Sequence, residues 1–134
     1  MSVNDNYSPI VLESEILNII SQIGITQNMF PGVRPSVTLT TGMNDFIVVR
    51  STTENVDLDA YGKTILAVEI YVKDKQNIRD SAKLSSARNL ICRLLPIITN
   101  RYIFSYSSET PILSDSNGFS FLAIKLFTII KNNN

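Results

Sequence analysis

The chain of 134 residues contains no histidine and a single cysteine, Cys92. The absence of histidine removes the commonest general base and the commonest ligand of transition metals. One cysteine cannot form an internal disulfide framework or a cysteine-rich zinc site. No Ser-His-Asp or Cys-His arrangement can exist, and the carboxylates and lysines suggest no catalytic set of their own. We therefore expect a protein that is not an enzyme and has no cofactor or metal.

An excess of charge is also lacking, because 12 basic residues are balanced by 12 acidic ones. A protein that coats nucleic acid needs surplus Lys and Arg, so no specific nucleic-acid partner is expected. Zero net charge provides little repulsion between copies, which leaves self-association open. The first residues lack the basic and apolar regions of a secretory signal, and the apolar runs are too short to span a membrane. We expect a protein that stays in the cytoplasm or is assembled there into something larger, without a membrane partner.

The most regular pattern lies between residues 64 and 95. Residues 64–73 alternate between apolar and polar side chains, as in a strand with one buried face, and Glu69 and Tyr71 lie on the other face. The segment 77–95 then follows helical periodicity, with one apolar stripe ahead of Pro96. A helix is therefore expected to pack on a sheet. The apolar residues of the two patterns are Leu66, Val68, Ile70 and Val72 in the strand, and Leu84, Ala87, Leu90, Ile91, Leu94 and Leu95 in the helix.

The remaining segments complete an α+β pattern within one domain, residues 1–134, with loose ends at 1–7 and 131–134. Ser8 and Pro9 suit the start of a helix, as cap and first helical residue. Residues 36–41 and 46–50 predict an antiparallel hairpin, and 101–107 and 119–130 predict two more strands. The expected fold is a mainly antiparallel sheet of about four to five strands with two amphipathic helices packed on it.

The last predicted strand, 119–130, is apolar on both faces. Phe119, Phe121 and Phe127 share one face, which Lys125 interrupts. Such a strand is covered by helices on both sides or is buried against another molecule. If both helices pack on one face, the aromatic face needs a partner from outside. The alternatives are that one helix covers each face, or that the strand crosses between two layers.

Two charged groups carry weaker signals. Asp57 and Asp59 alternate in a polar loop, 51–63, which is long enough to reach a neighbouring molecule but lacks the further ligands of a calcium site. A second group lies where the strand at 64–73 meets the following helix. It either contacts phosphate or an acidic partner, or it faces water. Its members are Lys73, Lys75, Arg79 and Lys83.

The order of these elements resembles the tail-terminator and tail-completion proteins of tailed bacteriophages, with their relatives in the head-to-tail neck. The resemblance rests on residues 65–74, 82–95 and 119–130. It implies a structural protein of the virion without catalytic residues, assembled in the host cytoplasm. Copies of such a protein form a ring, commonly of six, that caps the tail tube or joins the neck to the tail. Other neck or tail proteins are its further partners, and DNA can pass through the lumen of such a ring.

Two functional hypotheses follow. In the first, the chain is a ring subunit at the neck or tail end, and neighbouring subunits bury apolar sheet surface against each other. The alternative is a small cytoplasmic α+β module that binds a ligand or regulates, with Tyr71, Phe119 and Phe121 as the floor of an apolar pocket. The residues expected at the subunit interface are Glu69, Tyr71, Phe119, Phe121, Phe127, Asp57 and Asp59.

Overall fold

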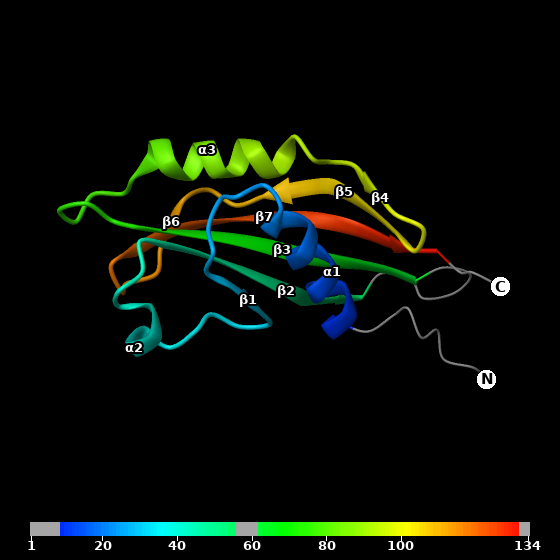
Figure 1. Ribbon diagram of the computed structural model, residues 1–134, viewed down its shortest axis with the longest axis horizontal. Helices are drawn as coiled ribbons and strands as arrows, with labels where there is room; N and C mark the ends of the chain where they lie inside the picture. The colour runs from blue at the N-terminus through cyan, green and yellow to red at the C-terminus, as the bar shows by residue number, and fades with distance from the viewer. Residues whose placement is uncertain (1–8, 56–61, 132–134) are drawn as a thin grey trace.

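A computed structural model describes residues 9–55 and 62–131, and its main feature is one mixed sheet (Figure 1). Within these residues the strand order is β1-β2-β3-β7-β5-β4, and β6 pairs with β7. The helices and strands, in chain order, are α1 (Pro9–Ser21), β1 (Met29–Pro31), α2 (Val37–Thr40), β2 (Asp45–Asn55), β3 (Gly62–Lys73), α3 (Ser81–Cys92), β4 (Ile97–Ile98), β5 (Tyr102–Glu109), β6 (Leu113–Ser114) and β7 (Phe119–Ile130).

The expected fold of four to five mainly antiparallel strands with two packed helices is wrong. Within residues 9–55 and 62–131, seven strands form a single sheet that curls like half of a barrel, and the helices are a small part of the structure. The sheet is mixed because β1 pairs with β2 in parallel, whereas the other pairs are antiparallel. The count was too low because β1, β4 and β6 have only two or three residues each, too few to show alternation.

One predicted strand is a helix. Residues 36–41, with one valine and three threonines, predict an extended segment, but 37–40 form the single turn α2. The hydroxyl of Ser36 accepts the backbone N–H of Leu39 at 3.2 Å, and Thr41 donates its hydroxyl to the carbonyl of Val37 at 2.7 Å. These local side-chain bonds offset the strand preference of β-branched residues. The partner of β2 is therefore β1 and not residues 36–41.

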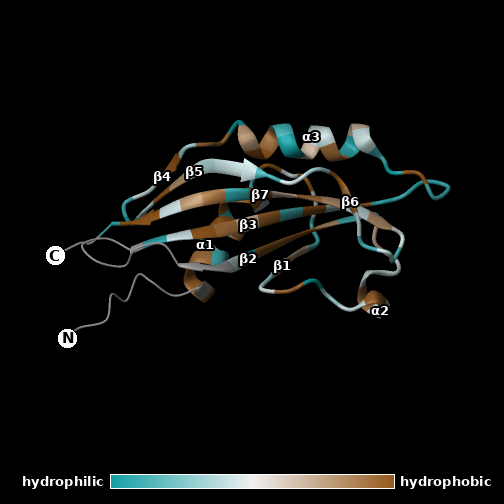
Figure 2. Ribbon diagram, turned by 180° about the vertical axis from the view of Figure 1, so that it is seen from behind, coloured by the Kyte–Doolittle hydropathy of each residue, from teal (hydrophilic) through white to brown (hydrophobic). Residues whose placement is uncertain are grey.

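Both longer helices pack on the same face of the sheet. Leu12, Ile16 and Ile20 of α1 recur every four residues and are buried in one cluster with Leu66 and Val68 of β3. That cluster also contains three buried residues of α3, namely Leu84, Ala87 and Ile91. Asp80 caps α3 by accepting the N–H of Lys83 at 3.1 Å. Figure 2 shows hydrophobic residues along the central strands beneath these helices.

Candidate interaction surface

The other face of the sheet, which we call the helix-free face, carries an aromatic cluster at one end. Phe46 of β2 stacks on Tyr71 of β3, with ring centroids 4.4 Å apart, and Tyr71 stacks on Phe121 of β7 at 4.8 Å. Phe119 meets Phe46 edge to face at 5.1 Å. Phe46, Tyr71 and Phe119 are each at most 3% exposed. These rings therefore form a second core of the chain itself.

The segment 29–43, which comprises β1, α2 and the residues that follow each, closes this second core from outside. Phe30 and Met43 pack against it, and Arg34 lies over its rings. The guanidinium carbon of Arg34 is 5.1 Å from the Phe46 ring centroid, 5.6 Å from Tyr71 and 5.7 Å from Phe119. Arg34 also donates to one carboxylate oxygen of Asp115, at 2.9 Å from Nε and 2.7 Å from Nη2. A ligand on this floor would have to displace Arg34.

A polar network continues the cluster along the helix-free face. The Tyr71 hydroxyl donates to Glu69 Oε1 at 2.9 Å, and Arg50 donates to the same oxygen at 2.6 Å. Burial raises the pKa of Tyr71, and the charge of Glu69 and its hydrogen bond raise it further. Glu69 is only 8% exposed, so this carboxylate serves the interior of the chain.

Beyond the network, the helix-free face has no such cover among the described residues. Phe127 and Ile129 of β7 are half-buried and belong to neither buried cluster. Their cross-strand partners on β5 are Ser105 and Ile103, which lie on the same face and are also half-buried. Among the described residues, we call this half-buried part of the apolar face, defined by Ile103, Ser105, Phe127 and Ile129, the available patch.

The structure separates the residues predicted for the interface. Tyr71 and Phe119 lie inside the second core, Phe121 is half-buried at its margin, and Glu69 is in the polar network. Phe127 alone lies in the available patch. Asp57 and Asp59 lie outside the described residues.

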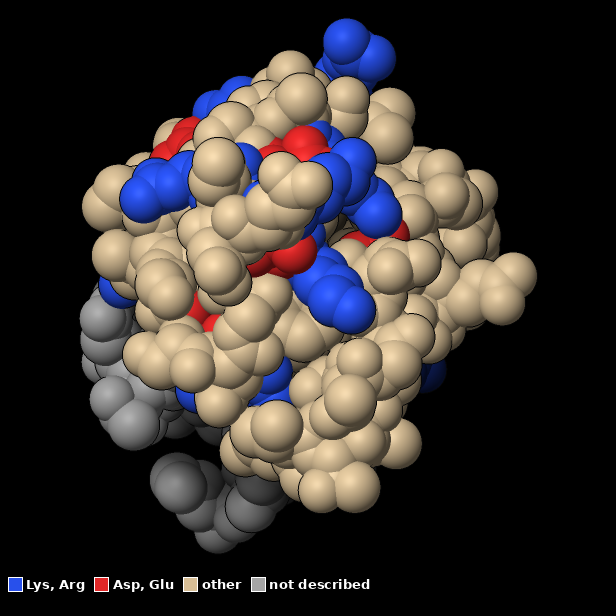
Figure 3. Space-filling model, turned by 90° about the vertical axis from the view of Figure 1, so that its left-hand side faces the viewer, with Lys and Arg blue, Asp and Glu red and all other residues tan. Residues whose placement is uncertain are grey.

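The predicted basic group is partly neutralised by acidic neighbours. Lys83 pairs with Asp45 at 2.8 Å, and Lys75 pairs with Asp80 at 3.4 Å. Lys73 and Arg79 are exposed. Figure 3 shows basic and acidic side chains interleaved on this end of the molecule. The mixture of signs does not form a basic surface of the kind that binds phosphate.

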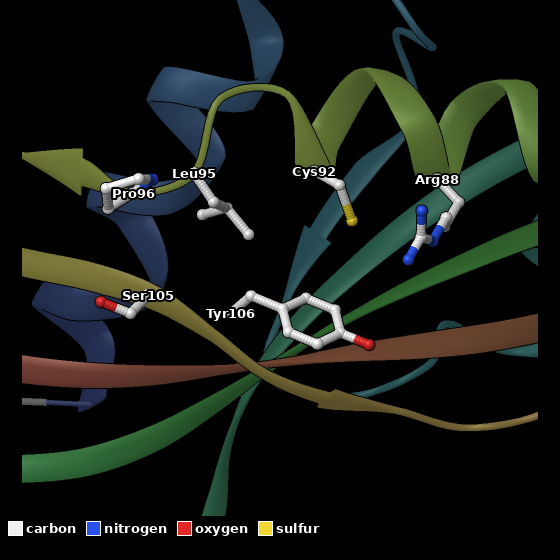
Figure 4. A pocket seen from close by; sticks show the side chains of 6 residues that line it. All are labelled: Arg88, Cys92, Leu95, Pro96, Ser105 and Tyr106. Carbon is white, nitrogen blue, oxygen red and sulfur yellow. The ribbon is translucent and has the colours of Figure 1, made fainter.

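A groove lies between the last turns of α3 and strand β5 (Figure 4), and sequence reasoning missed it because its walls come from separate elements. Its volume is about 510 Å³. Arg88 donates to both carboxylate oxygens of Glu109, at 3.1 and 3.2 Å from Nε, and the Tyr106 hydroxyl donates to the same carboxylate at 2.8 Å. We call it the β5 groove; its lining residues are Arg88, Cys92, Leu95, Pro96, Ser105 and Tyr106.

The titratable groups of the β5 groove are held in fixed states. Hydrogen bonds from Arg88 hold the pKa of Glu109 below its usual range, and the hydrogen bond to Glu109 raises the pKa of Tyr106. Burial raises the pKa of the Cys92 thiol, which disfavours the reactive thiolate. The groove therefore presents a closed ion pair and an unreactive thiol at neutral pH.

The Arg88–Glu109 pair makes a pH-dependent contribution to stability. Because the folded pKa of Glu109 is lowered, this contribution is present above the unfolded pKa and is lost as pH falls through the folded value. We expect Glu109→Gln to lower the free energy of unfolding by about 1 kcal/mol or less near neutral pH, since the pair is partly exposed. Urea unfolding of both proteins should show this difference vanish well below the usual pKa of glutamate. If the free energies of unfolding of the two proteins differed equally near neutral pH and well below the usual pKa of glutamate, the pH-dependent contribution of the Arg88–Glu109 pair would be contradicted.

Within residues 9–55 and 62–131, no group of three or more acidic or cysteine side chains is placed to hold a metal ion. No helix in the described part of the chain is long and apolar enough to cross a membrane. Comparison of the sequence with models of protein families gave no match, and comparison with curated proteins gave none.

Proposed function

We propose that this chain is a non-catalytic structural subunit that assembles with copies of itself into a ring, at the neck or tail end of a tailed-phage particle. The observation that carries the proposal is the placement of α1 and α3 on one face of the sheet. In the part of the chain that the structure describes, that placement leaves Phe127 and Ile129, on a central strand, without a helix over them. The ring and its place in a virion are taken from the resemblance in element order to the phage neck and tail proteins.

The energy of assembly would come from burial of apolar sheet surface. Removing about 400 Å² of apolar surface from water contributes on the order of 10 kcal/mol before the cost of association is subtracted. The patch of Ile103, Ser105, Phe127 and Ile129 itself carries no charged side chain, and Lys63 on β3 and Lys125 on β7 lie at its border. Zero net charge adds little repulsion between copies.

Phe127→Asp tests this proposal. We expect the variant to fold and to lose the ring, because a carboxylate buried at the contact would be left without a partner. Sedimentation velocity and negative-stain microscopy of wild type and variant would measure the loss.

Ile78→Asp is the matched control, since Ile78 is 68% exposed in the turn between β3 and α3, away from the patch. It makes the same chemical change and should keep the ring. Thermal unfolding followed by circular dichroism shows whether each variant is folded. A folded Phe127→Asp variant that still forms rings would remove this patch from the interface.

A further inference from the structure

A small pocket lies on the helix-bearing side of the sheet, between α3 and the connection from α1 to β1. Its volume is about 180 Å³, and Figure 1 shows this connection passing beneath α3. The floor is apolar, because it is made by Ile47, Ile70 and Val72, each at most 2% exposed. We call it the α3 pocket; its walls include Ile25, Lys83, Ala87 and Leu90.

The wall that α3 contributes changes from charged to apolar along the helix. Lys83, Ala87 and Leu90 follow one another at spacings of four and three residues, which places them on one face. Seven residues of helix separate Lys83 from Leu90 by about 10 Å. Leu90 is 39% exposed beside the pocket. The pocket therefore suits an elongated molecule with a polar head at the Lys83 end and an apolar body.

The charges at the polar end favour a head group that accepts hydrogen bonds. Lys83 Nζ lies 2.8 Å from a carboxylate oxygen of Asp45, which also lines the pocket. A lysine ammonium has three N–H donors, and this ion pair uses one of them. The side chain of Lys83 is 42% exposed and that of Asp45 is 19% exposed, so an entering molecule meets the ammonium first. Carboxylates are among the acceptors that bind an ammonium most strongly.

The volume limits the apolar body. An apolar cavity of about 150 Å³ is large enough to bind benzene, so a pocket slightly larger holds a body of about six carbon atoms. Drug-sized ligands occupy pockets of roughly 300–1,000 Å³, which excludes them from this one.

We propose that the α3 pocket binds a small monocarboxylate with an apolar chain of about six carbon atoms, such as a short fatty acid. The carboxylate accepts a second N–H of Lys83, which keeps its bond to Asp45. The chain lies on Ile47 and Ile70 and extends along α3 toward Leu90. This inference goes beyond the proposed function, since the pocket lies on the opposite side of the sheet from the available patch.

Three probes with the same chain and different head groups test the pocket, namely hexanoate, hexan-1-ol and hexylamine. Isothermal titration calorimetry of the full chain at neutral pH measures each affinity. Hexanoate should bind about tenfold more tightly than hexan-1-ol, because its bond to Lys83 is charge-assisted on both sides. Hexylamine repeats the charge of Lys83 and should bind less tightly than hexanoate.

Two variants locate the binding. Lys83→Met removes the ammonium and keeps the aliphatic stem, so it should weaken hexanoate binding about tenfold and leave that of hexan-1-ol unchanged. Lys75→Met is the matched control, since Lys75 pairs with Asp80 and does not line the pocket; it should bind hexanoate like wild type. Leu90→Glu places a charge at the apolar end and should weaken the binding of both probes. Circular dichroism shows whether each variant is folded.

A wild-type chain that binds none of the three probes would overturn the α3 pocket as a ligand site. Hexanoate binding no tighter than that of hexan-1-ol or hexylamine would overturn the carboxylate as the head group. Hexanoate binding that is unchanged in both Lys83→Met and Leu90→Glu would lie elsewhere on the chain and would overturn the proposal.

Discussion

Replacement of Phe46 by alanine is expected to lower the free energy of unfolding by about 3–5 kcal/mol, a large part of the stability of a domain of this size. Phe46 is fully buried and is the centre of the second core. Its ring contacts Tyr71 and Phe119, and Arg34 lies over it. Alanine would leave a cavity and remove one of the three rings beneath the guanidinium.

This expectation is checked by urea unfolding of Phe46→Ala and Phe127→Ala, each compared with wild type. Phe127 is also a phenylalanine on the helix-free face, but it is half-buried and belongs to neither cluster. In the isolated monomer, Phe127→Ala should lower the free energy of unfolding by clearly less than Phe46→Ala does. Equal losses of stability in the two variants would mean that the second core contributes no more than the available patch.

Arg34→Ala should destabilise the fold by about 3–5 kcal/mol, because it leaves the carboxylate of Asp115 in the interior without its partner. The side chain of Asp115 is 6% exposed and that of Arg34 is 17% exposed, so water compensates for little of the loss. The variant also loses the contacts of the guanidinium with three rings and its hydrogen bond to the carbonyl of Pro35 at 2.6 Å.

A double-mutant cycle with Asp115→Ala separates these contributions. The double variant should be less destabilised than the sum of the single variants, since removing both partners leaves no buried charge. Arg34→Lys keeps the charge but loses the planar group that covers the rings, and it should fall between wild type and Arg34→Ala. If the losses in the free energy of unfolding of Arg34→Ala and Asp115→Ala simply added in the double variant, Arg34 would act through the rings alone.

Residue patterns predicted the long elements of this fold. The strand predicted at 119–130 has these bounds in the structure, and the helix predicted over 77–95 occurs as the shorter α3, Ser81–Cys92. The sheet's size was missed because very short strands have no period. The helix α2 was missed because hydroxyl capping by Ser36 is stronger than the strand preference of its one valine and its threonines.

The candidate surface was only partly predictable. An apolar face on 119–130 was evident, but its cover was not, because Arg34 reaches Asp115 across 81 residues of sequence. The β5 groove was not predictable from the sequence either, because its lining residues come from separate elements, among them α3 and β5. Phe119 and Phe127 look alike as positions on one strand, and only the placement of 29–43 distinguishes a core residue from a surface one.

The mass of the wild-type chain in solution tests the central claim most directly. Native mass spectrometry over a range of concentrations should show a closed oligomer of the 15.0 kDa chain, with six copies giving about 90 kDa, and no open-ended series. A monomer that persists at the highest concentration would contradict assembly through the helix-free face.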